Sequence, residues 1–83
     1  MPNILIVEDK DSMRKMLTET LTGEGHRVDS APNGKSAMEL VHSKSYDLVL
    51  TDLKMPDMDG LQVLSNVKEV DNDTAVILMT AYG

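Results

Sequence analysis

The chain has 83 residues, of which fourteen are acidic and eight basic, so its net charge is -6 and its length fits one small domain. The acidic balance argues against direct binding of nucleic acid, because such binders neutralise the phosphate backbone with Lys and Arg. Cysteine is absent, which excludes disulfides, thiolate nucleophiles and Cys-based zinc sites and favours a reducing, cytoplasmic location.

The first predicted element is a strand over Asn3–Glu8. Its four consecutive apolar residues, Ile4–Val7, indicate a strand that is buried on both faces, as in a parallel sheet. This run is too short to cross a membrane or to serve as the apolar part of a signal peptide. We therefore expect a protein that is neither exported nor inserted into a membrane.

A helix is predicted next, capped by Asp11 or Ser12 and ended by Gly23 and Gly25. Its apolar positions recur at the spacing of one helix face and are Met13, Met16, Leu17, Thr20 and Leu21.

The segment His26–Ala31 is predicted to be a second strand. Because most of its residues are polar, it suits the edge of a sheet better than the centre.

The second half of the chain repeats this alternation of strand and helix. After the turn Pro32–Gly34, a short helix is predicted with its apolar face at Ala37, Leu40 and Val41. The segment Tyr46–Thr51 is predicted to be a third buried strand, and Asp52 stands at its carboxyl end.

The segment Lys54–Gly60 is predicted to be a loop, because Pro56 disfavours a regular helix and Gly60 permits unusual backbone dihedral angles. A third helix follows, with its apolar face at Leu61, Leu64 and Val67. The last predicted element is a buried strand over Ala75–Met79 that reaches Thr80.

Four strands separated by helical crossovers predict an α/β fold. The strands must lie parallel, and the right-handed crossover rule favours a doubly wound open sheet. Sheets of this kind bind ligands beyond the carboxyl ends of their strands, near the point where the strand order reverses. That edge of the sheet is therefore where functional residues are expected.

Three acidic residues follow the first and third strands: Glu8, Asp9 and Asp52. Two ionised carboxylates about 5 Å apart repel by roughly 3 kcal/mol at an effective dielectric constant near 20. A Mg²⁺ ion would relieve this repulsion, and an Asp beside Mg²⁺ can act as a nucleophile that forms an aspartyl phosphate. The alternative is that these acids are simply the hydrophilic ends of apolar strands, which is the usual explanation for a single acid.

Three segments resemble the receiver domain of two-component response regulators, namely Ile4–Asp9 (ILIVED), Asp47–Gly60 (DLVLTDLKMPDMDG) and Val76–Gly83 (VILMTAYG). They span nearly the whole chain in the order found in that family. The most specific of them is the run from Thr51 to Gly60, and its amino-acid sequence is most similar to that of the NtrC class of transcriptional activators. The resemblance implies a flavodoxin-like doubly wound parallel sheet with the strand order 2-1-3-4.

The resemblance also implies a role for each residue of the site. Asp52 would accept a phosphoryl group from a sensor histidine kinase in the presence of Mg²⁺. Asp9 would bind the ion directly, Glu8 would contact it chiefly through water, and the backbone carbonyl of Lys54 would be a further ligand. The hydroxyl of Thr80 would hydrogen-bond the phosphoryl oxygen as a switch. Phosphorylation of such a module alters its association with partners or controls transcription. The module is therefore not expected to be an enzyme.

A complete receiver continues with a helix, a fifth strand that carries a Lys and an aromatic residue, and a final helix. We therefore expect residues 1–83 to form a truncated receiver domain of about four strands and three helices. The edge of the fourth strand would then be exposed, and two chains could pair there as a homodimer. A fragment that is not phosphorylated and serves only as a dimerisation module is the alternative.

An Asp-nucleophile phosphohydrolase of the haloacid dehalogenase type is a less favoured alternative. It also forms an aspartyl phosphate with the help of Mg²⁺. That class places a second acid two residues after the nucleophile, whereas Lys54 stands at that position here. The sequence therefore favours the receiver over the hydrolase.

Overall fold

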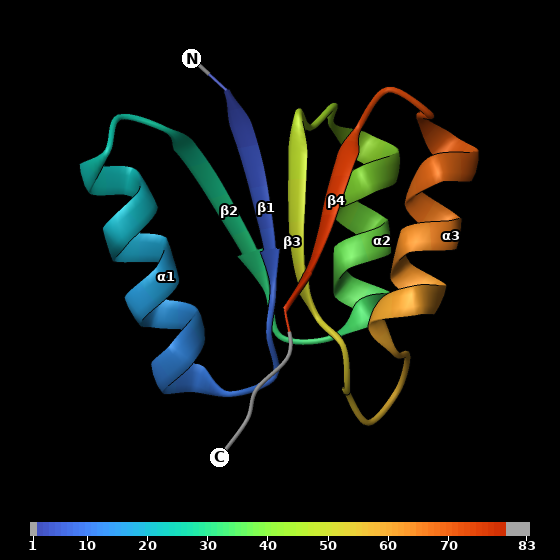
Figure 1. The fold of residues 1–83 in the computed structure, drawn as a ribbon, viewed down its shortest axis with the longest axis horizontal. Helices are drawn as coiled ribbons and strands as arrows, with labels where there is room; N and C mark the ends of the chain where they lie inside the picture. The colour runs from blue at the N-terminus through green and yellow to red at the C-terminus, as the bar shows by residue number, and fades with distance from the viewer. Residues whose placement is uncertain (1, 80–83) are drawn as a thin grey trace.

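Four parallel strands form a single sheet in the order β2-β1-β3-β4, and three helices connect them (Figure 1). This computed structural model describes residues 2–79. Its elements, in chain order, are β1 (Asn3–Val7), α1 (Asp11–Gly23), β2 (Arg27–Ala31), α2 (Gly34–Ser43), β3 (Leu48–Asp52), α3 (Gly60–Val70) and β4 (Ala75–Met79). The predicted α/β class, the parallel sheet and the strand order 2-1-3-4 are confirmed.

The strand β1 lies in the interior of the sheet because it is the most apolar and pairs on both sides. Ile4 is in register with Val28 of β2 and with Leu48 of β3. Every residue of β1 from Ile4 to Val7 is buried, which confirms the prediction of a strand covered on both faces. The predicted edge position of β2 is also confirmed, since within the described part of the chain it pairs with β1 alone.

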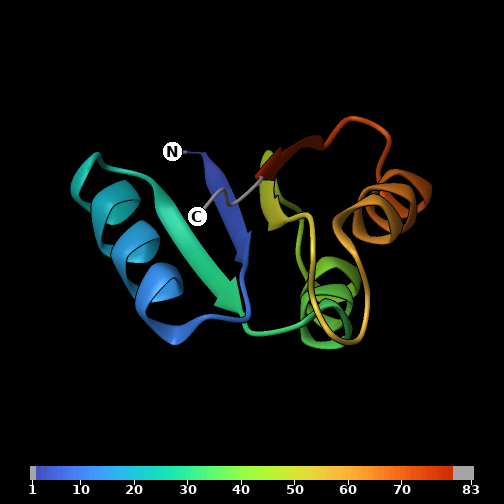
Figure 2. The ribbon, with the colours of Figure 1, turned by 60° about the horizontal axis from the view of Figure 1, so that its bottom comes forward.

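The helices cover the two faces of the sheet unequally. Helix α1 packs against β1 and β2, whereas α2 and α3 pack against each other and against the sheet (Figures 1 and 2). The main core lies beneath α2 and α3, and its buried residues are Leu5, Val7, Ala31, Ala37, Val41, Tyr46, Val49, Val63 and Val67. Burial of these side chains supplies the main driving force for folding.

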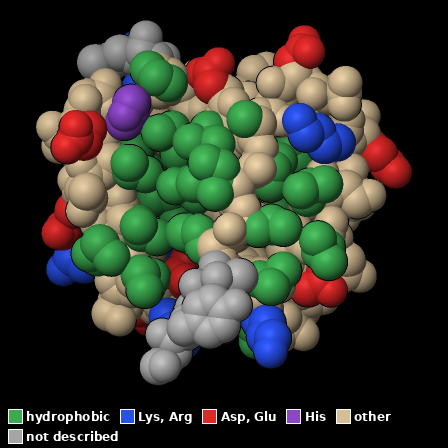
Figure 3. All heavy atoms as spheres, in the orientation of Figure 1, with side chains coloured by type: hydrophobic (Ala, Val, Ile, Leu, Met, Phe, Trp, Pro, Cys, Tyr) green, Lys and Arg blue, Asp and Glu red, His purple; other side chains and the backbone are tan. Residues whose placement is uncertain are grey.

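The prediction that β4 is a buried strand is wrong. Val76 packs against the main core, and alternation along a strand directs Ile77 to the opposite face, where the residue is 50% exposed. In the view of Figure 1, α2 lies behind β4 and α3 lies to its right, and Figure 3 shows hydrophobic side chains over the middle of the face toward the viewer. Among residues 2–79, no helix covers β4 on that face.

The predicted cap of α1 is also wrong. The residue at the cap position is Lys10, which makes no side-chain hydrogen bond to the helix, and α1 begins at Asp11. The carboxylate of Asp11 instead forms an ion pair with the guanidinium of Arg14, at 2.5 Å between Oδ1 and Nη2. None of the residues of α1 is fully buried, so its predicted apolar face is only partly covered.

Candidate functional site

The three acids predicted to form the site meet at the carboxyl edge of the sheet. Glu8 and Asp9 directly follow β1, and Asp52 is the last residue of β3. The two strands are adjacent and parallel, with Val7 in register with Thr51, so both strands end at the same edge. Within residues 2–79, one carboxylate oxygen from each of the three acids lies within 4.8 Å of the others. The expected gathering of the acids is therefore confirmed.

The acids lie close together, and two of the three are shielded from water. The side chains of Glu8 and Asp52 are buried, and Oδ1 of Asp9 is buried without a hydrogen-bond partner among the described residues. Burial raises the pKa of Glu8, and the neighbouring carboxylates of Asp9 and Asp52 raise it further, against the lowering effect of a hydrogen bond from the Lys10 backbone N–H. The site therefore holds more negative charge than its surroundings neutralise.

The basic side chains near the site do not neutralise these carboxylates. The guanidinium of Arg14 donates to the backbone carbonyl of Glu8, at 2.9 Å, and forms its ion pair with Asp11. Among the described residues, the other ion pair joins Lys44 to Asp29, which is on β2. Clustered carboxylate oxygens, one of them buried and unpartnered, form a donor set that fits a small, hard divalent cation such as Mg²⁺.

Gly60, the first residue of α3, lies against the backbone of Asp52. A Cβ atom at this position would be 2.6 Å from the carbonyl oxygen of Asp52 and 3.0 Å from Cα of Leu53. The unusual backbone dihedral angles that a glycine permits are not used at Gly60, because the glycine with positive φ among the described residues is Gly25. Gly60 instead permits a close approach of α3 to the end of β3. Its position after a Pro-containing loop could not have revealed this contact.

Helix α3 begins with a capping box. The side chain of Asp59 accepts a hydrogen bond from the backbone N–H of Gln62, at 2.8 Å, and the side chain of Gln62 accepts one from the backbone N–H of Asp59, at 3.0 Å. This reciprocal pair satisfies two backbone donors and fixes where the helix starts. Together with Gly60, it determines the position of the loop that follows Asp52.

The two remaining predicted site residues are placed less fully by the structure. Lys54 lies two residues after Asp52, in the loop between β3 and α3, and its side chain is exposed. Thr80 lies outside the described residues, so its role as a switch hydroxyl stays a prediction. The functional assignments of all the site residues likewise stay predictions at this point.

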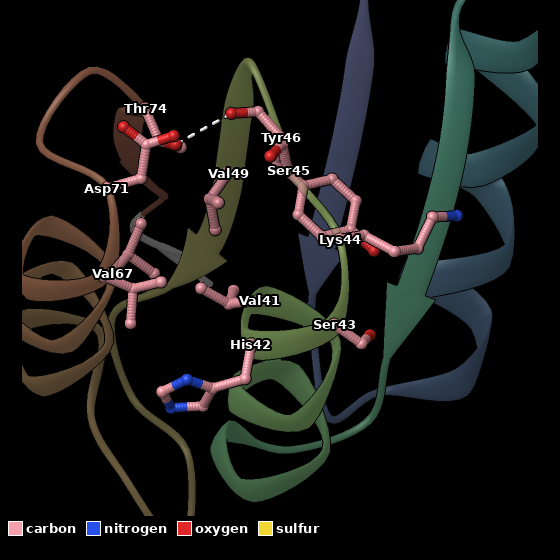
Figure 4. A pocket seen from close by; sticks show the side chains of 11 residues that line it. Val41, His42, Ser43, Lys44, Ser45, Tyr46, Val49, Val67, Asp71 and Thr74 are labelled. Atoms are coloured by element: carbon pink, nitrogen blue, oxygen red, sulfur yellow. Dashed lines mark hydrogen bonds between the residues drawn. The ribbon is translucent and has the colours of Figure 1, made fainter.

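A cavity of about 260 Å³ lies at the opposite end of the sheet (Figure 4). It is lined by the last turns of α2 and α3 and by residues at the amino ends of β3 and β4. On its wall, the hydroxyl of Thr74 donates to the backbone carbonyl of Tyr46, at 2.8 Å. The hydroxyl of Tyr46 donates to Oδ2 of Asp29, at 2.7 Å. These hydrogen bonds fix the walls of the cavity, which is separate from the acidic cluster.

None of the helices within residues 2–79 combines the length and the apolar character that a membrane span requires.

The family model for the response regulator receiver domain matches residues 4–83. Sporulation initiation phosphotransferase F of Bacillus subtilis (strain 168) is 44% identical over 80 residues, which are 96% of this chain and 64% of that protein.

Relatives also include NtrC-like regulators. Regulatory protein AtoC of Escherichia coli (strain K12) is 42% identical over 79 residues, 95% of this chain and 17% of AtoC. The chain thus spans less than two thirds of the length of the curated relatives named here.

Solved structures agree with the sequence relatives. Response regulator TrrA of Thermotoga maritima, in complex with Mg(2+)-BeF, superposes with a TM-score of 0.92 and is 40% identical. The match covers 100% of this chain and 72% of TrrA. A structure of histidine kinase ThkA in complex with TrrA matches with a TM-score of 0.90 and the same identity and coverage.

Proposed function

Since the chain belongs to the response regulator receiver domain family, we propose that it accepts a phosphoryl group on Asp52 from a sensor histidine kinase in the cytoplasm. Receiver domains of response regulators are signalling modules. The output of this one would be altered association or, as in its NtrC-like relatives, control of transcription, and not catalytic turnover. The observation that carries the proposal is the gathering of Glu8, Asp9 and Asp52 at one edge of the sheet.

The proposed transfer is a nucleophilic displacement at phosphorus. A carboxylate oxygen of Asp52 attacks the phosphorus of the phosphohistidine, the phosphorus–nitrogen bond breaks, and its electron pair stays on the imidazole. The product is an acyl phosphate on Asp52. Burial of the Asp52 side chain limits the access of water to this product and favours a phosphoryl group that persists long enough to signal.

The residues present also fit a Mg²⁺ ion. We propose that Asp9 and Asp52 bind it directly, that Glu8 contacts it through water, and that the backbone carbonyl of Lys54 completes the protein ligands. The ion would supply positive charge that stabilises the phosphoryl oxygens during transfer. The unpartnered Oδ1 of Asp9 supports this assignment, because a buried carboxylate oxygen without a partner is costly.

Mg²⁺ should stabilise the folded chain. At ten times its dissociation constant, Mg²⁺ is expected to raise the free energy of unfolding by about 1.4 kcal/mol, because it binds the folded state and not the unfolded one. Urea denaturation of the chelator-treated chain, with and without Mg²⁺, measures this difference. In Asp9→Asn the gain should be lost, while the metal-free variant should be at least as stable as the wild type because one of the like charges is gone.

The control for this experiment is Asp73→Asn. Asp73 is an exposed acid in the turn before β4, remote from the acidic cluster, and its carboxylate makes no hydrogen bond among the described residues. This variant should keep the full gain from Mg²⁺. The same gain in Asp9→Asn as in the wild type would show that Asp9 does not hold the ion.

We also propose that two chains pair through β4 as a homodimer. Among residues 2–79, β4 pairs with β3 alone, and Ile77 is half exposed on its uncovered face. Unpaired strand edges readily add another strand. Sedimentation equilibrium should show a dimer whose population falls in Ile77→Lys, because a charge at the interface opposes burial. A monomer at all concentrations would exclude this mode of association.

A further inference from the structure

The loop that follows Asp52 is closed at its base. The backbone N–H of Gly60 donates to the carbonyl of Leu53, at 2.8 Å, and the N–H of Leu53 donates to the carbonyl of Met79 on β4, at 2.9 Å. The residues between Leu53 and Gly60 therefore leave the sheet and return to it at one point. Lys54, whose carbonyl is the proposed metal ligand, is the first residue of the loop beyond this closure.

The outer part of the same loop is attached to α2 by Asp57. Its two carboxylate oxygens accept hydrogen bonds from the backbone N–H groups of Gly34, at 3.2 Å, and of Lys35, at 3.1 Å. These are the first two residues of α2, and the next N–H, that of Ser36, donates to the side chain of Asn33, at 2.8 Å. The donors exposed at the start of α2 are thus satisfied by two side chains, one of them from a distant loop.

The negative charge of Asp57 suits this position. The amino end of a helix carries partial positive charge, which attracts a carboxylate. Accordingly, the hydrogen bonds from the backbone of Lys35 and then of Gly34 lower the pKa of Asp57. Asp57 is ionised in neutral solution and is available to both N–H groups at once.

A second contact attaches the neighbouring residue. Met58 packs so closely on Gly34 that a Cβ atom on Gly34 would lie 2.6 Å from Cβ of Met58. The sulfur of Met58 also accepts a weak hydrogen bond from the side chain of Asn66 on α3, at 3.6 Å. Met55 and Met58 both pack against the main core. The two ends of the loop are therefore joined by the hydrogen bond between Gly60 and Leu53, and its outer part is held by α2 and α3.

We infer that Asp57 is a positioning residue, which holds the loop after Asp52 in one conformation and thereby fixes the carbonyl of Lys54 beside the acids. The link to Mg²⁺ rests on the proposed function. The link to the loop rests on hydrogen bonds and packing alone. Pro56, between Asp57 and Lys54, has a restricted φ, which reduces the number of backbone conformations open to the segment that joins these two residues.

Two variants of the 83-residue chain test this inference. Asp57→Ala removes both hydrogen bonds to α2, and Gly34→Ala displaces Met58 without changing any charge. In each variant the Gly60 amide, which closes the loop, should exchange with solvent at least about tenfold faster in the metal-free chain, because the loop opens locally. Each should also bind Mg²⁺ about tenfold more weakly, the size of effect typical of residues that support metal ligands. Amide exchange by NMR and calorimetric titration with MgCl₂ measure the two quantities.

Asp73→Ala is the matched control for the lost charge. Titration at high salt further separates position from charge, because salt screens the long-range attraction of Asp57 for Mg²⁺. The weaker binding of Asp57→Ala should persist at high salt, and Asp57→Asn, which keeps one acceptor oxygen, should restore part of the affinity. Circular dichroism checks that each variant is folded.

The outcomes are distinguishable. Unchanged Gly60 exchange in folded Asp57→Ala and Gly34→Ala would overturn the inference, whatever the Mg²⁺ titrations give. Mg²⁺ affinities within twofold of the wild type, despite faster Gly60 exchange, would overturn the link from the loop to the metal. If the wild type binds no Mg²⁺, the proposed metal site fails, while faster Gly60 exchange in both variants would still support Asp57 as the residue that holds the loop.

Discussion

Replacing Asp52 with Asn will abolish the transfer of a phosphoryl group from acetyl phosphate to this chain. An amide lacks the negative charge and the nucleophilic oxygen of a carboxylate, so an acyl phosphate cannot form at residue 52. The experiment incubates the 83-residue chain with acetyl phosphate and Mg²⁺ and then records the intact mass. The wild type should gain the mass of one phosphoryl group, and Asp52→Asn should gain none.

The remaining arms of this experiment separate the three functional alternatives. Asp73→Asn should be phosphorylated like the wild type, because its carboxylate lies far from the acidic cluster. Repeated release of inorganic phosphate without a lasting adduct would favour the phosphohydrolase. A wild-type chain that forms no adduct and releases no phosphate would favour an interaction module that is not phosphorylated.

Gly60→Ala should destabilise the folded chain by about 2 kcal/mol, as expected when extra volume is forced into a tightly packed region. The added methyl group would meet the Asp52 carbonyl at 2.6 Å and a methyl carbon of Leu78 at 2.9 Å. One of these neighbours is backbone, so the start of α3 must move away from the end of β3. Urea denaturation monitored by circular dichroism measures the change in the free energy of unfolding.

The matched control for this substitution is Gly23→Ala. An added Cβ at Gly23, the last residue of α1, meets no atom within 4 Å. Because alanine favours the helix more than glycine does, the control should be stabilised by up to about 1 kcal/mol. Equal stabilities of Gly60→Ala and the wild type would show that α3 does not need its close contact with Asp52.

The fold and the acidic cluster could be predicted because they follow from regular patterns. Apolar runs such as Ile4–Val7 indicate buried parallel strands, and parallel strands bring the residues that follow them to one edge. This reasoning placed Glu8 and Asp52 together although they are far apart in the sequence. The resemblance to receiver domains added the strand order, which alternation of strands and helices alone does not determine.

Other features depend on contacts that no local pattern encodes. The sequence predicts Asp11 or Ser12 as the cap of α1, but the helix begins at Asp11 after Lys10, and the carboxylate of Asp11 forms an ion pair with Arg14. The strand β4 was predicted to be buried because its residues are apolar, yet its exposure depends on which helices cover the sheet. The attachment of Asp57 to α2 joins residues 22 and 23 positions apart. That residues 1–83 form a truncated receiver domain stays a prediction.

The central position of β1 also determines the order in which this site can be built during synthesis. Asn3 pairs with Arg27 of β2, and Ile4 pairs with Leu48 of β3. The first strand therefore cannot pair until β2 and β3, which are synthesised later, have left the ribosome. Because Asp52 is added after both partner strands have begun, the acidic cluster cannot exist in the nascent chain before β3 has emerged. A cation that needs ligands from both strands can therefore bind only after β3 has emerged and paired with β1.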